Sequence, residues 1–82
     1  MGKVLLIEDD VGLCVSLKNS FKTEGFELEY VHNGEDARSK LFSSGASPYD
    51  LLIMKIMMTK ENGDDLLKEI REHSPDIPVI ML

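Results

Sequence analysis

Two apolar runs in the chain each stop at charged side chains that could act together. The run at residues 4–7 is followed by three consecutive acids: Glu8, Asp9 and Asp10. The run at residues 51–54 is followed by Lys55. If both runs are neighbouring parallel strands, these charges emerge at the carboxyl edge of the sheet, where open α/β sheets place their chemistry. A lysine among two or three carboxylates should stay charged and lower their pKa values, which predicts an internally neutralised acidic pocket.

Each half of this constellation has a simpler interpretation. Acids are favoured at a helix N-terminus without any ligand, and Asp9 or Asp10 could cap the helix that follows. Lys55 could be a tolerated surface lysine that reaches out from a strand end. For Lys55 we favour the pocket, because opposite charges end the two buried runs. For the three acids, the residues alone favour the helix N-terminus.

The elements that would position these residues alternate along the chain. Residues 3–7, 26–31, 51–54 and 77–82 have the apolar content of strands, and the alternating second one is expected at a sheet edge. Helical spacing separates them, and the apolar positions of the three helices are Leu13, Cys14, Leu17 and Phe21, then Ala37, Leu41 and Phe42, then Leu66, Leu67 and Ile70. Gly25 is expected to end the first helix, and the third must end before Pro75. This alternation predicts a parallel α/β sheet.

Several other residues have a structural interpretation. Residues 43–48 are expected to form a short polar connector, and residues 60–62 a solvated loop. Core packing is predicted for three methionines: Met54, Met57 and Met58. Cys14 is expected to be a buried, inert thiol with no histidine nearby. His32 is predicted to lie in a turn and His73 at a helix end.

Size and charge limit the classes of function. The 82 residues, 43% of them hydrophobic, suggest one domain spanning residues 1–82. A net charge of −6 argues against binding a nucleic-acid backbone. A single cysteine fits a reducing compartment, and no segment has the composition of a signal peptide or a membrane span, so we expect a cytoplasmic protein without a membrane partner. Neither a dinucleotide-binding glycine motif nor a nucleophile–histidine set is evident, so catalysis is not expected.

The segments VLLIEDD and YDLLIMKIMM, followed by Gly63, resemble the receiver domain of two-component response regulators. The resemblance implies a doubly wound, flavodoxin-like sheet of order 2-1-3-4. In that family the position of Lys55 is an aspartate that accepts a phosphoryl group, and the position of Thr59 is usually a proline. The family positions that hold Mg²⁺ are the carboxylates of Glu8 and Asp9 and the backbone carbonyl of Met57. With lysine at position 55, we expect no cofactor.

The resemblance also predicts partners and extent. Family receivers are phosphorylated by a sensor histidine kinase or a phosphotransfer protein. They continue past Leu82 with a helix, a strand and a further helix, so this chain is expected to be an incomplete receiver-like domain (βαβαβαβ), truncated after the fourth strand. We predict a receiver that cannot be phosphorylated at position 55. The alternative is a truncated fragment that acts as an interaction or oligomerisation module, as a homodimer through its exposed fourth strand.

Overall fold

The computed structural model describes residues 2–42 and 48–82, and these form a four-stranded parallel sheet with three helices. The elements are β1 (Lys3–Ile7), α1 (Val11–Thr23), β2 (Glu27–Val31), α2 (Gly34–Phe42), β3 (Leu51–Met54), α3 (Gly63–His73) and β4 (Val79–Met81). The strand order is β2-β1-β3-β4, which confirms the predicted order and places β2 at an edge. The connector predicted at residues 43–48 lies, except for Pro48, outside the described residues.

The two central strands are buried on both faces, which explains their continuous apolar runs. In β1, Leu5, Leu6 and Ile7 are fully buried, and β1 pairs with both β2 and β3. The register opposes Ile7 to Met54, so β1 and β3 end side by side. This register brings the residues after the two strands to one edge of the sheet.

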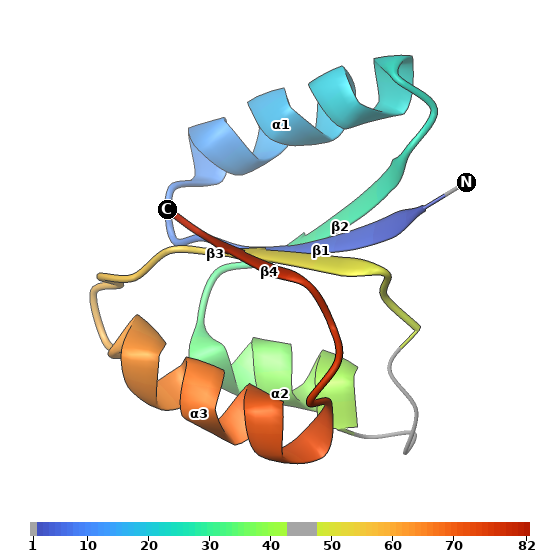
Figure 1. The fold of residues 1–82 in the computed structure, drawn as a ribbon. Helices are drawn as coiled ribbons and strands as arrows, with labels where there is room; N and C mark the ends of the chain where they lie inside the picture. Colours follow the sequence, from blue (N-terminus) through green and yellow to red (C-terminus); the bar gives the residue numbers. More distant parts are fainter. Residues whose placement is uncertain (1, 43–47) are drawn as a thin grey trace.

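The helices cover the sheet on two sides (Figure 1). One side carries α1, and the other carries α2 and α3. Side chains alternate between these layers, as expected for strands. Leu5 and Ile7 pack with the buried residues of α2 and α3, whereas Val4 and Leu6 pack with Cys14 of α1.

Local signals set the helix boundaries. Asp10 caps α1 by accepting a hydrogen bond from the Leu13 amide, and Asn62 caps α3 in the same way for Asp64. Gly25 follows α1 with a φ of 85°, a left-handed conformation that glycine adopts without strain. The predicted ends of α1 and α3 are therefore confirmed.

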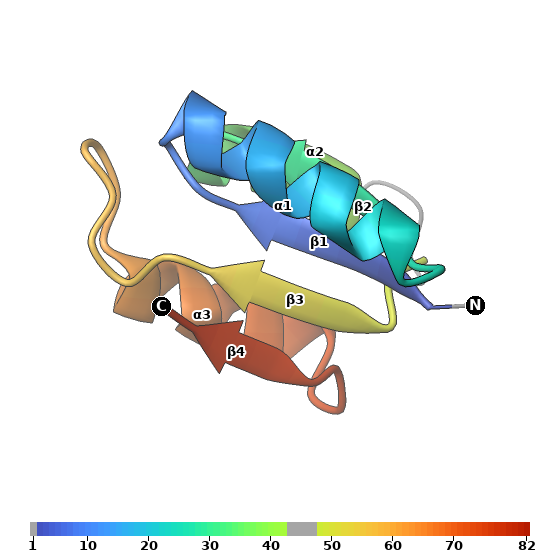
Figure 2. The ribbon, with the colours of Figure 1, turned by 90° about the horizontal axis from the view of Figure 1, so that it is seen from above.

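The sheet is covered unevenly on the α1 side. Figure 2 shows α1 over β1 and β2, with β3 and β4 lying beside it. Ile80 of β4 opposes Ile53 of β3, which packs on the α1 side, and Ile80 is 48% exposed. The predicted fourth strand, residues 77–82, was too long, because β4 covers Val79–Met81, although the backbones of Pro78 and Leu82 still hydrogen-bond to β3.

Three predictions about individual side chains were wrong. Leu13 is exposed, because it lies about 100° around α1 from the buried Cys14, at the margin of the face that packs on the sheet. Met57 is 80% exposed, because strand alternation stops at Met54, whereas Met54 and Met58 are buried as predicted. In the loop at residues 60–62, Glu61 is not simply solvated, since it pairs with Arg38 of α2.

Candidate functional site

The turn after β1 and the loop after β3 meet at the carboxyl edge of the sheet. The Lys55 amide donates to the carbonyl of Ile7 at 3.0 Å, which continues the β1–β3 pairing by one residue. Lys55 is therefore held beside the first residues of the β1–α1 turn. The backbone pairing of β1 with β3, and not a side-chain contact, sets this position of Lys55.

The Lys55 ammonium lies between two carboxylates. Its Nζ is 3.2 Å from Oδ1 of Asp9 and 3.5 Å from Oε2 of Glu8. The hydrogen bond to Asp9 and the negative charge of Glu8 raise the pKa of Lys55 above its ordinary value. The side chain is thus a fixed cation at neutral pH, with 37% of its surface exposed.

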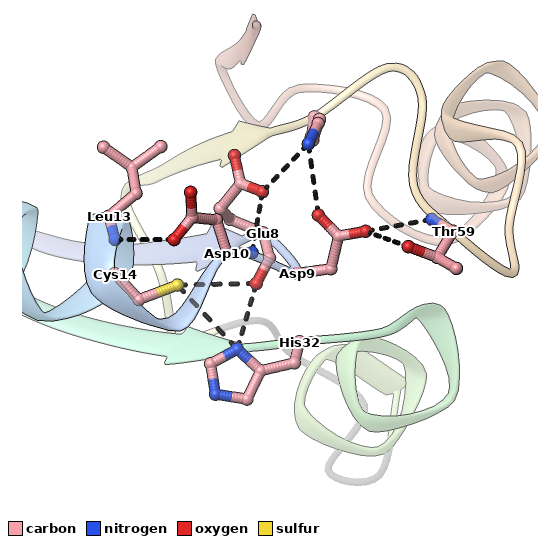
Figure 3. Close-up of polar contacts among 8 residues, drawn as sticks. Glu8, Asp9, Asp10, Leu13, Cys14, His32 and Thr59 are labelled. Carbon is pink, nitrogen blue, oxygen red and sulfur yellow. Dashed lines mark hydrogen bonds and ion pairs between the residues drawn. The ribbon is translucent and has the colours of Figure 1, made fainter.

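Asp9 is also bound from the other side by Thr59 (Figure 3). The Thr59 amide donates to Oδ2 of Asp9 at 2.9 Å, and the Thr59 hydroxyl donates to the same oxygen at 2.7 Å. These two hydrogen bonds, followed by the one from Lys55, hold the pKa of Asp9 well below its usual range. Both carboxylate oxygens of Asp9 therefore have partners within the protein.

Glu8 and Asp10 have different roles in this cluster. Glu8 is only 3% exposed, and its Oε2 accepts a hydrogen bond from the Asp10 amide at 3.0 Å. The Asp10 carboxylate turns to the N-terminus of α1, where Oδ1 accepts from the Leu13 amide at 3.1 Å (Figure 3). The structure thus brings together Lys55, Glu8 and Asp9, and it uses Asp10 as the helix cap.

The donor set at this edge does not fit a divalent cation. Mg²⁺ requires octahedral oxygen ligands, whereas an ammonium group lies between the carboxylates of Glu8 and Asp9. In residues 2–42 and 48–82, no group of three or more His, Cys, Asp or Glu side chains is placed to share a metal ion. Met57 lies on the β3–α3 loop and forms an isolated antiparallel bridge with Asn62.

A cysteine–histidine contact lies next to the cluster, contrary to the prediction that Cys14 has no histidine nearby. The Cys14 thiol donates to the Glu8 carbonyl at 3.4 Å, His32 Nδ1 lies 3.0 Å from the same oxygen, and Sγ and Nδ1 are 3.9 Å apart (Figure 3). The parallel pairing of β1 with β2 causes this, because it places His32 beside Glu8. Burial raises the pKa of the thiol to about 11, so Cys14 is a protonated structural donor.

Two of these contacts could not be read from local sequence patterns. Thr59 and His32 are separated from their partners by 50 and 24 residues. For Thr59 a signal was available, since it supplies an amide and a hydroxyl where the resembled family usually has a proline. For His32 we find no local signal.

The strand order β2-β1-β3-β4, with helices on both sides of the sheet, defines a doubly wound, flavodoxin-like α/β domain. Residues 4–82 match the response regulator receiver domain, and the chain belongs to this family. It is a receiver domain of the kind found in two-component systems. The structure contains no helix, within the described residues, with the length and apolar character needed to cross a bilayer.

Relatives and solved structures agree with this assignment. The chain is 43% identical over 82 residues to the transcriptional regulatory protein CpxR homolog of Haemophilus influenzae, and spans about a third (34%) of that protein's length. The response regulator TrrA of Thermotoga maritima, in a complex with Mg²⁺ and BeF, is 33% identical, with a TM-score of 0.87 over 99% of this chain and 68% of TrrA. TrrA bound to the histidine kinase ThkA matches with the same identity and TM-score, over 99% of this chain and 67% of TrrA.

Proposed function

We propose that this receiver domain does not accept a phosphoryl group at position 55 and keeps one charge state at its acidic edge. The observation that supports the proposal is the Lys55 ammonium held between Asp9 and Glu8 at 3.2 and 3.5 Å. A carboxylate can serve as the nucleophile in aspartyl-phosphate formation. Lysine has no carboxylate, and its amine is kept protonated by the two acids.

The same ion pairs support independence from Mg²⁺. The family positions of the metal ligands are Glu8, Asp9 and the Met57 carbonyl, and the first two already pair with the Lys55 ammonium. A divalent ion would have to displace the Lys55 ammonium from the two carboxylates. Because the lysine is part of the chain, its charge would stay nearby, so the ion and the lysine together would place three positive charges near two negative ones. We therefore infer that neither phosphorylation nor metal loading changes this site.

Family membership supports the choice of partner and setting. TrrA, a relative in fold and sequence, is known in complex with a histidine kinase. We infer that this chain contacts a sensor histidine kinase or a phosphotransfer protein in the cytoplasm without receiving the phosphoryl group. It would act as a signalling module, not as an enzyme.

Incubation with acetyl phosphate followed by intact-mass measurement tests the proposal. We expect no phosphate adduct on the unsubstituted chain, in the presence or absence of Mg²⁺. The Lys55→Asp variant is the matched control, because it restores a carboxylate at the same strand end. A phosphate adduct mapped to the peptide that contains Lys55 would refute the proposal.

A second candidate function is supported by the edge strand β4. Within residues 2–42 and 48–82, β4 pairs with β3 and with no other strand, and Ile80 and Leu82 are 48% and 53% exposed. Apolar edge strands form templates for pairing with another chain. We infer that two copies could pair through β4, which would make the domain a homodimerisation module.

Light scattering across a concentration series tests this second candidate. We expect a dimer that Ile80→Lys converts to a monomer, because a charged side chain on an edge strand opposes pairing with another chain. Val15→Lys is the matched control, since Val15 is exposed to a similar extent (45%) but lies on α1. A monomer at every concentration, or equal effects of the two substitutions, would contradict the candidate.

A further inference from the structure

The β3–α3 loop is held in place at both its base and its tip. At its base, the Gly63 amide donates to the Ile56 carbonyl at 2.7 Å, and Met57 bridges to Asn62. At its tip, both donors of Thr59 reach one oxygen of Asp9. The contact at the tip joins the loop to the β1–α1 turn, as the Lys55 ion pairs do where the loop leaves β3, and it needs no ligand.

Thr59 and Lys55 bind different oxygens of the Asp9 carboxylate. Lys55 takes Oδ1, and Thr59 takes Oδ2 with two hydrogen bonds of 2.7 and 2.9 Å. Hydrogen bonds to an ionised carboxylate are shorter and stronger than those between neutral groups. Replacing Lys55 alone would therefore free only one of the two oxygens.

We propose that Thr59 is a second determinant of the metal-independent site: its amide and hydroxyl hold Asp9 against the β3–α3 loop and compete with a divalent ion for this carboxylate even when residue 55 is an aspartate. This inference rests on the proposed function, because it concerns the same acidic edge. It adds a residue, 59, whose backbone and side chain both act on Asp9. Thr59 is in this sense a positioning residue, since it acts through Asp9.

The test is a titration with Mg²⁺ alone, in which calorimetry and amide chemical shifts monitor binding. It compares Lys55→Asp with the double variant Lys55→Asp/Thr59→Val, which removes the hydroxyl and keeps a β-branched side chain. Loss of one charge-assisted hydrogen bond that competes for Asp9 should tighten Mg²⁺ binding by about fivefold or more. The matched control is Lys55→Asp/Thr23→Val, because the Thr23 hydroxyl donates to Asn19 within α1, away from the site.

A second measurement reports on the closed loop without any metal. Hydrogen exchange of the Thr59 amide should be slow in the unsubstituted chain and should become at least tenfold faster in Asp9→Ala, which removes its acceptor. The same exchange rate in both proteins would show that Asp9 does not hold the amide, and would overturn the proposal even if a double variant failed to fold.

The outcomes separate this proposal from the one on which it rests. Equal Mg²⁺ affinity in Lys55→Asp and Lys55→Asp/Thr59→Val, including no measurable binding by either, would overturn the role of Thr59. An equal gain from Thr23→Val would do the same. A phosphate adduct at position 55 of the unsubstituted chain would instead refute the proposed function.

Discussion

Replacing Gly63 with alanine is expected to destabilise the domain, because the new methyl group would meet backbone atoms of the β3–α3 loop. A Cβ at this position would lie 2.6 Å from the carbonyl oxygens of both Ile56 and Lys55 and 2.8 Å from the Cα of Ile56. Backbone atoms cannot rotate away as a flexible side chain could. Among the described residues only Gly25 has a positive φ, so the conflict at Gly63 is one of space, not of backbone conformation.

The expected cost follows from two contributions. Overpacking costs about 1–3 kcal/mol, and loss of the Gly63–Ile56 hydrogen bond adds about 1 kcal/mol, so Gly63→Ala should lower the free energy of unfolding by about 2–4 kcal/mol. A domain of this size has a total stability of about 4–12 kcal/mol. The substitution should therefore remove a large share of the stability of the protein.

Urea unfolding followed by circular dichroism measures this loss. Gly12→Ala is the matched control, because its Cβ would lie 3.5 Å from its nearest neighbour, Oδ1 of Asp10, on the exposed face of α1. Alanine is the better helix former, so this control should gain about 0.5–1 kcal/mol. An unfolding midpoint of Gly63→Ala within error of the parent or above it would refute the steric reasoning.

Two further predictions concern the core and the acid range. Ile70→Ala should cost about 2–5 kcal/mol, because Ile70 is fully buried against the sheet, whereas Val15→Ala on the exposed face of α1 should change stability by less than about 0.5 kcal/mol; the same urea midpoints check both. Glu29 accepts hydrogen bonds from Tyr49 and Lys3, which lower its pKa to about 2. Its carboxylate therefore contributes stability above its usual pKa of 4.5, and this contribution is lost as the pH falls from 4.5 towards 2. Thermal unfolding across that range measures the effect: the free energy of unfolding lost between pH 4.5 and pH 2 should be smaller in Glu29→Gln than in the parent, by at most about 3 kcal/mol. Equal losses in the two proteins would contradict the prediction.

The sequence by itself determined the elements and their class. The continuous apolar runs at residues 4–7 and 51–54 predict strands buried on both faces, and β1 and β3 are such strands. The helix end near Gly25 and the stop before Pro75 depend on the conformations open to single residues, so they too are local properties. The resemblance to receivers supplied the strand order, which alternation alone leaves open.

Only the tertiary structure decided which side chains share the acidic edge and how. Lys55 and Thr59 meet Asp9 across 46 and 50 residues, and Cys14 meets His32 across 18, because the parallel register aligns the ends of the strands. No local sequence pattern predicts contacts between residues so far apart in the chain. The same dependence explains the exposed Met57: a loop side chain is placed by long-range packing, whereas a strand side chain follows its alternation.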